Sequence, residues 1–492
     1  MIILSYLAVG AIALALILLS KSHRVMNAFS ILHTLAFLAI GLYALLTTAV
    51  PAFEPGSKYF YVDHLSIYEV LIAALLFFLA SVYANGYVES LMQAKELHRN
   101  NLKIFYTAFS LLLTTVILAF FSDNLALFWI FAELTTVFSA ALVAILSAKE
   151  NIDAAIKYIF IASGAMLFSF IGLIFLYTLS GEVLGNGTLN WTVLTENATL
   201  LSPKTLTASF VFLFIGFAAK SGIFPFHTWL PDAHSKAPSA VSAILSGVLL
   251  NVGVYGILRM YAIVRQTQAE HLISQFLMGF GLLTVALAVL NMLMQRNLKM
   301  LIAFSSVEHM GILLLGIGVG TPLALFWTLF YILAHSLTKA SLFFSAGILH
   351  RQYESNLIQD MRDVLSLQPI AGWGFIIGSF AIIGMPPFPI FSAKLFILLE
   401  AFGFSKSLVF AVLLLLVIAS AAFARFLIEA FTQSSKDAGT GEPETPLIPY
   451  IVRKGMKFPI LIIIFMTLSL GVFFPESLEN LLNEIVHELG YI

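Results

Sequence analysis

Long apolar runs alternate with short polar stretches along the whole chain. The runs are about 20 residues long, which is the length that an α-helix needs to cross the hydrocarbon core of a bilayer. This pattern predicts an all-α polytopic membrane protein with about fourteen transmembrane helices. The expected spans cover residues 2–20, 26–49, 64–86, 103–121, 124–147, 154–180, 206–224, 238–263, 272–294, 299–319, 321–348, 371–401, 405–431 and 457–475.

Two of these expected spans combine a lysine with prolines. Lys220 precedes Pro225 near the end of the span at 206–224, and Lys394 follows a group of prolines in the span at 371–401. A lysine at bilayer depth costs roughly 2.5 to 3.5 kcal/mol on insertion scales, so a retained one usually serves ion movement. Proline breaks a helix, and two broken spans in different halves of a chain point to an ion pathway between internal repeats. The alternative for Lys220 is a side chain that snorkels to the cytoplasmic face.

The composition narrows the class of protein. Hydrophobic residues make up 60% of the 492 residues and charged residues only 10%, which excludes a soluble fold. A net charge of −1 leaves no basic surplus for binding nucleic acid. Cysteine is absent, so thiolate-held iron-sulfur clusters and cysteine-zinc sites are excluded. We expect no catalytic residue, cofactor or metal site here; redox chemistry would occur on partner chains or on a cofactor held without cysteine.

Lysine and arginine gather in the loops on one side of the expected spans. We count fifteen of them there against five on the other side, Arg259 being one of the five. Cytoplasmic loops collect basic residues, so both termini of this cell-membrane protein are expected on the outer side. The polar loop at 432–449 is expected to be a flexible cytoplasmic connection. Leucines at helical spacing predict a short amphipathic helix at 476–489 on the outer surface.

Titratable residues also lie inside the apolar runs. Glu133 lies in the span at 124–147 among apolar neighbours. At about 4 Å and an effective dielectric constant of 20, two unit charges interact by about 4 kcal/mol, so switching a contact between a carboxylate and a lysine could release a proton. The other interpretation of Glu133 is a static buried ion pair. His335 and Lys339 are four residues apart and therefore share one helical face, where they could pass a proton through a water molecule.

Four further residues are open to two interpretations. Glu308 and His309 are adjacent and point in different directions, and His309 is the better interior candidate. Lys157 lies one turn inside its span, so it either takes part in translocation or snorkels to the interface. Glu400 lies near the end of its span and either faces the interior or is solvated.

The same residues fall in strings that resemble one family of membrane proteins. The strings are WIFAEL at 129–134, Lys157-Tyr158, KSGIFPFHTWLPDAHSKAP at 220–238, NLKMLIAFSSVEHM at 297–310, and residues 384–394. They resemble the proton-pumping membrane subunits of respiratory complex I and the large subunits of Mrp-type cation/proton antiporters and membrane-bound hydrogenases. The match covers nearly the whole chain, and the string HTWLPDAHSKAP is the most specific part of it.

The resemblance implies a core of fourteen helices. Helices four to eight and nine to thirteen would form two inverted five-helix repeats, with the seventh and twelfth helices broken. The corresponding divisions are residues 1–102 for the first three helices, 103–264 and 265–431 for the repeats, and 432–492 for a loop, the last helix and the amphipathic tail.

The resemblance also implies roles for individual residues. Glu133 matches the carboxylate of the fifth helix and Lys220 the lysine of the seventh, which together form the charge pair of the pump. His335 and Lys339 match the connecting residues of the eleventh helix. Lys394 matches the last titratable residue before the outside.

The sequence departs from the family at Asn251. Some members carry a lysine at this point of the eighth helix, whereas an amide can hold a water molecule but cannot take up and release a charge. The middle of the relay would then depend on water, on His309 or on an altered route. The chain also stops soon after the fourteenth helix and lacks the long lateral helix of the most distal complex I subunit, which favours the Mrp-like and hydrogenase-like assignments.

The sequence therefore predicts an antiporter-like subunit that moves protons, or exchanges sodium for protons, within a redox-driven membrane complex. Its partners would be other antiporter-like and small membrane subunits, together with a peripheral redox module that holds iron-sulfur clusters and nickel or flavin. Two other functions stay open. One is a stand-alone cation/proton transporter, and the other is a structural membrane subunit that no longer conducts ions.

Overall fold

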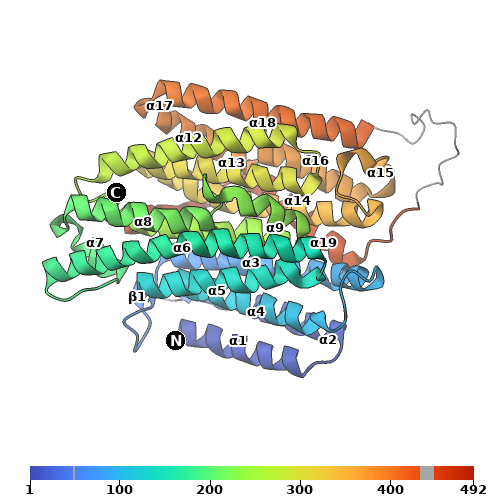
Figure 1. The fold of residues 1–492 in the computed structure, drawn as a ribbon, viewed down its shortest axis with the longest axis horizontal. Helices are drawn as coiled ribbons and strands as arrows, with labels where there is room; N and C mark the ends of the chain where they lie inside the picture. Colours follow the sequence, from blue (N-terminus) through green and yellow to red (C-terminus); the bar gives the residue numbers. More distant parts are fainter. Residues whose placement is uncertain (48–49, 433–447, 492) are drawn as a thin grey trace.

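The computed structural model describes residues 1–47, 50–432 and 448–491. Its long helices lie side by side, from α1 and α2 at one edge to α17 and α18 at the opposite edge (Figure 1). The helices are α1 (Ile2–Leu19), α2 (His23–Thr47), α3 (His64–Gln93), α4 (Asn101–Phe120), α5 (Leu125–Val143), α6 (Lys149–Leu184), α7 (Trp191–Glu196), α8 (Pro203–Lys220), α9 (Leu230–Lys236), α10 (Ser239–Ile244), α11 (Leu250–Val264), α12 (Glu270–Met294), α13 (Leu298–Val319), α14 (Pro322–Tyr353), α15 (Val364–Leu367), α16 (Pro369–Ile383), α17 (Pro389–Phe404), α18 (Lys406–Thr432), α19 (Lys454–Val472) and α20 (Glu476–Glu488).

Short turns and one small hairpin complete the described structure. The turns are η1 (Ala144–Leu146), η2 (Ala198–Leu200), η3 (Phe226–Trp229), the π-helical η4 (Leu245–Leu249) and η5 (Ile358–Asp360). Strands β1 (Ala52–Phe53) and β2 (Tyr61–Val62) pair antiparallel, with Ala52 opposite Val62. This hairpin is a small departure from the all-α prediction. Most of the polar loop predicted at 432–449 lies outside the described residues.

Twelve helical segments in the described ranges are long and apolar enough to cross a membrane. They coincide with twelve of the predicted spans and make the chain a multi-pass membrane protein. The two predicted spans that are not among them, 206–224 and 371–401, are those that contain the lysine and proline combinations. Both are interrupted in the structure.

The first interruption follows Lys220, the last residue of α8. Gly222 has a φ of +67°, and a Cβ atom there would lie 2.4 Å from Leu230 Cδ1, so only glycine fits this turn. The chain then turns back through η3 and α9. Trp229 Nε1 donates a hydrogen bond to Ala219 O at 2.9 Å, which ties the returning segment to the end of α8.

The second interruption separates α16 from α17. Helix α16 ends at Ile383, and Gly384 adopts a left-handed conformation with a φ of +87°. Helix α17 begins at Pro389, where proline is well tolerated because the first residue of a helix has no intrahelical partner for its N–H group. Lys394 therefore lies in the second turn of α17.

Four spans form the buried centre of the bundle. The segment from α10 through α11 is completely buried, α13 and α14 nearly so, and α3 mostly so. The spans α1, α18 and α19 bury few of their residues and carry large apolar residues on the outside. Polar side chains of the central spans are thus shielded from lipid by the surrounding helices.

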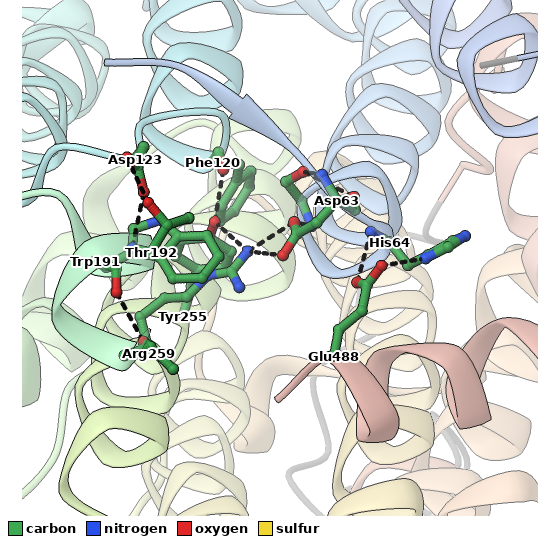
Figure 2. A network of polar contacts seen from close by, with 11 residues as sticks. Asp63, His64, Phe120, Asp123, Trp191, Thr192, Tyr255, Arg259 and Glu488 are labelled. Atoms are coloured by element: carbon green, nitrogen blue, oxygen red, sulfur yellow. Dashed lines mark hydrogen bonds and ion pairs between the residues drawn. The ribbon is translucent and has the colours of Figure 1, made fainter. Parts of the chain in front are cut away.

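A buried ion pair joins two of the central spans at one end of the bundle. Arg259 of α11 contacts Asp63, the N-cap of α3, at 2.7 Å, and both side chains are 2% exposed (Figure 2). The guanidinium lies 4.0 Å from the Trp191 ring centroid and 4.7 Å from that of Tyr255. We had counted Arg259 only among the basic residues of the outer side; aromatic stacking and a carboxylate partner allow its charge to be buried within the helix.

Neighbouring contacts extend this cluster. Asp123 lies between α4 and α5 and accepts hydrogen bonds from the backbone N–H (3.1 Å) and the hydroxyl (3.0 Å) of Thr192 (Figure 2). His64 Nδ1 lies 2.6 Å from Glu488, which attaches α20 to α3. Helix α20 is the amphipathic helix that leucine spacing predicted, and Leu482 and Ile485 are buried. The cluster therefore fixes α3, α7, α11 and α20 at one end of the molecule.

We expect the stability of this end to depend on pH through Asp123. Burial raises the pKa of Asp123 from its usual 3.8 to about 6. Between about pH 4 and about pH 6 the folded chain keeps this proton while the unfolded chain loses it, so the free energy of unfolding falls as pH rises through this window. Thermal unfolding of wild type and Asp123→Asn should therefore differ in pH dependence there. Parallel curves for the two proteins would contradict this assignment.

Candidate ion-translocation site

The first part of the site lies between α5 and α8. Lys220 is 1% exposed, and its ammonium donates a hydrogen bond to Thr136 Oγ1 at 2.8 Å. Thr136 is one helical turn after Glu133 on α5, so both groups lie on the face toward Lys220. Glu133 is half-buried and accepts a 2.8 Å hydrogen bond from Ser163 of α6. The structure thus places the predicted carboxylate and lysine on adjacent helices, with the lysine bound to a hydroxyl.

The end of α8 supplies a favourable environment for the ammonium. Lys220 occupies the last turn of α8, where the backbone carbonyls carry the negative end of the helix dipole. The break also brings Trp229 against Tyr158, with ring centroids 4.1 Å apart. The hydroxyl of Tyr158 lies 2.9 Å from that of Ser139 on α5. The break thus adds the hydroxyl groups of Tyr158 and Ser139 to that of Thr136 on this side of α5.

The second part of the site lies between α13 and α17. Lys394 Nζ is 3.1 Å from Glu308 Oε1, with side-chain exposures of 8% and 2%. Glu308 Oε2 lies 3.2 Å from Nε2 of His309. Our preference for His309 over Glu308 was incomplete, because α13 is buried on nearly all sides and adjacent residues can both face the interior. Glu308 is the direct partner of Lys394.

His335 and Lys339 of α14 extend this set of buried polar groups toward the centre of the bundle, and we refer to the whole set as the row. The Lys339 ammonium donates hydrogen bonds to Ile302 O at 2.8 Å and to the hydroxyl of Ser305, both on α13. The ring of His335 lies 5.2 Å from that of His309, centroid to centroid. Both residues are buried on one helical face, as predicted. Lys339 hydrogen-bonds to α13, whereas neither ring nitrogen of His335 has a hydrogen-bond partner among the described residues. The two side chains do not hydrogen-bond to each other.

Asn251 lies between the two parts, on α11. Its amide group donates to Glu69 Oε2 of α3 and to Ser336 Oγ of α14, each at 3.2 Å. Glu69 is 1% exposed and was missing from the sequence-derived set. The signal was present, because Glu69 is an acidic residue inside an apolar span.

The remaining candidates lie apart from this row. Lys157 is 44% exposed and pairs with Asp232 at 2.6 Å, which corresponds to the snorkelling alternative. Glu400 accepts a 2.7 Å hydrogen bond from Thr321 at the start of α14. In the described part of the chain, no group of three or more histidine or acidic side chains is arranged to hold a metal ion.

Several polar atoms along the row have no hydrogen-bond partner in the described chain. They include Glu133 Oε1, Glu69 Oε1, Asn251 Oδ1 and both ring nitrogens of His335. A buried polar atom without a partner costs about 1 to 3 kcal/mol, so such atoms are commonly served by internal water. The row therefore combines titratable groups with positions that suit water molecules.

Comparisons with known proteins agree with this architecture. Residues 122–421 match the family model described as NADH:quinone oxidoreductase/Mrp antiporter, transmembrane. A hydrogenase-4 component F homolog from Methylacidiphilum infernorum is 32% identical over 357 residues, which are 72% of this chain and 75% of that protein.

Two solved structures share the fold. One belongs to the membrane-bound sulfane sulfur reductase, an archaeal respiratory membrane complex: its TM-score is 0.86 at 22% identity, over 99% of this chain and 96% of that chain. The other belongs to the Mrp complex from a Dietzia species, with a TM-score of 0.84 at 19% identity, over 100% of this chain and 97% of that chain.

We expect the pair of Glu308 and Lys394 to be energetically coupled. Removing one partner of a buried pair leaves an uncompensated charge, which typically costs about 3 to 5 kcal/mol. Glu308→Gln, Lys394→Met and the double variant should thus show a coupling energy above about 1 kcal/mol in thermal unfolding. The exposed pair of Lys157 and Asp232 is the matched control, with an expected coupling below about 1 kcal/mol. Equal coupling in the two cycles would contradict the assignment.

Proposed function

The chain belongs to the NADH:quinone oxidoreductase/Mrp antiporter transmembrane family, and from this premise we propose that it conducts protons, or exchanges sodium ions for protons, along its buried polar row. It is an antiporter-like membrane subunit, like its relatives in hydrogenase, complex I and Mrp assemblies. The observation that carries the proposal is the series of groups from half-buried Glu133 and buried Lys220 to the buried pair of Glu308 and Lys394. If the row only stabilised the fold through ion pairs, its central lysines would be expected to contact carboxylates. They contact only hydroxyl and carbonyl oxygens instead.

The proposed architecture has fourteen spans, ten of which form two inverted five-helix repeats, residues 103–264 and 265–431. The twelve continuous spans and the two broken ones, α8–α9 and α16–α17, add up to this number. Further support comes from matching positions: a carboxylate on the second helix of each repeat, Glu133 or Glu308, and a lysine on the broken fourth helix, Lys220 or Lys394. Residues 1–102 and 432–492 would flank the repeats.

Translocation in this proposal proceeds by exchange of contacts. The Lys220 ammonium can move between Thr136 and Glu133, which are neighbours on α5, and each exchange alters the charge balance of the row. Two charges about 4 Å apart at an effective dielectric constant of 20 interact by about 4 kcal/mol, enough to drive uptake or release of a proton. Ions would enter from the cytoplasm near Lys220 and Lys236 and leave near Lys394.

The proposed setting is a larger complex in the cell membrane. The hydrogenase relative and the sulfur reductase neighbour are named as parts of redox assemblies. We infer partners of the same kind, namely antiporter-like and small membrane subunits with a peripheral redox module. Iron-sulfur clusters and nickel or flavin would reside on that module. From the basic loops we infer that both termini lie outside the cytoplasm.

Replacing Lys220 with alanine tests the proposal. In proteoliposomes that contain the intact native complex, Lys220→Ala should lower ion flux per turnover by at least about tenfold, because the row loses the amine that changes contacts. Flux is measured with a pH-sensitive dye and with radioactive sodium. Lys204→Ala is the matched control, since Lys204 is an exposed residue at the other end of α8. It should keep flux within about twofold.

Other results would favour a different function. Unchanged flux in Lys220→Ala would identify a structural subunit that does not conduct ions. Full transport by the purified chain alone would identify a stand-alone transporter.

A further inference from the structure

Glu69 is the one carboxyl of the buried row that lies outside both proposed repeats. It belongs to α3, in the N-terminal segment, and is 1% exposed. The sequence of α3 around it is apolar, and the side chain points toward α11 rather than toward lipid, as its contact with Asn251 shows. The function proposed above does not use this residue.

The described hydrogen-bond contact of Glu69 comes from a neutral amide and not from a cation. Its Oε2 atom accepts a hydrogen bond of 3.2 Å from the amide of Asn251, and its Oε1 atom has no partner in the described chain. The groups on α11 and α14 that face Glu69 are Asn251, Tyr255 and Ser336, and all three are neutral. The Tyr255 hydroxyl donates its hydrogen bond to Phe120 O and not to Glu69. No ion pair of the described residues includes Glu69, in contrast to Asp63 on the same helix.

Such an environment is a poor one for a permanent charge. An ionised carboxylate in a low-dielectric interior needs a cation or several hydrogen-bond donors, and one amide supplies only part of this. A role in packing or hydrogen bonding could be met by glutamine. Glu69 is therefore suited to being neutral while it holds a proton and to becoming charged only when that proton leaves.

The position of Glu69 bridges the two parts of the site. On one side, Ser221 follows Lys220 and donates a 3.0 Å hydrogen bond to Leu250 O, next to Asn251. On the other side, Ser336 follows His335 on α14 and accepts from the Asn251 amide. Glu69 and Asn251 therefore lie between the lysine of the first part and the histidine of the second.

We infer that Glu69 is the proton carrier at the middle of the row, replacing the titratable group that α11 lacks because it has Asn251. This inference rests on the proposed function. A hydronium ion arriving from the Lys220 side transfers its proton to the carboxylate, so that one O–H bond breaks and one forms at Glu69. The carboxyl then gives the proton to a water molecule on the His335 side and becomes a carboxylate again. Asn251 holds the carboxyl in place in both states.

Two substitutions at Glu69 distinguish a titrating role from a structural one. Glu69→Gln keeps the size and the hydrogen bond to Asn251 but cannot exchange a proton, so proton flux per turnover of the intact complex should fall at least about tenfold. Glu69→Asp keeps a titratable group and should retain clearly more flux than Glu69→Gln. Thermal unfolding of Glu69→Gln should be unchanged or higher in midpoint, because a buried ionisable group is removed.

Glu89→Gln is the matched control, because Glu89 lies on the same helix but pairs with Arg453 at 2.6 Å outside the row. It should keep flux within about twofold. Normal flux in Glu69→Gln together with lost flux in Lys220→Ala would overturn the role of Glu69 and leave the proposed function standing. Equal loss in Glu69→Gln and Glu69→Asp, with a lowered unfolding midpoint in both, would show that the residue is structural. Normal flux in both Glu69→Gln and Lys220→Ala would overturn the proposed function itself.

Discussion

A charged group inside a membrane protein must be compensated, because neither lipid nor a packed core solvates it. The chain meets this constraint in two ways. At one end of the bundle, Arg259 and Asp63 form a close pair covered by Trp191. Along the central row Lys394 pairs with Glu308, but the compensation of three other groups is partial: Lys220 and Lys339 contact hydroxyl or carbonyl oxygens, and Glu69 contacts one amide. Fixed pairing suits a structural clamp, whereas partial pairing leaves groups free to exchange partners.

The fold creates the conditions for partial pairing. The surrounding helices shield the four central spans, so polar groups can be retained there without facing lipid. The two helix breaks end regular backbone bonding inside the bundle and place Lys220 at the end of one helix and Lys394 near the start of another. Unpaired backbone groups at such ends attract ions and water. The breaks and the buried lysines are therefore parts of one arrangement.

Much of this arrangement could be predicted from sequence, and the reasons are specific. Twelve spans follow from apolar run length, and both breaks follow from glycine and proline beside a buried lysine. Contacts between side chains of different helices could not be predicted, because hydropathy does not determine which helix faces pack against each other. Glu308 was therefore undervalued beside His309, Glu69 was overlooked, and the burial of Arg259 by an aromatic ring and a carboxylate from distant segments was not foreseen.

The proposed function requires the row to be a hydrated path for ions and not a set of isolated polar contacts. The most direct measurement is a high-resolution map of the native complex in a lipid environment, in which ordered water molecules can be located. Our account predicts water joining the surroundings of Lys220, Asn251, His335 and Lys394 in a continuous line of hydrogen bonds. A well-ordered map with tightly packed apolar side chains and no water between Lys220 and Asn251, or between Asn251 and His335, would contradict it.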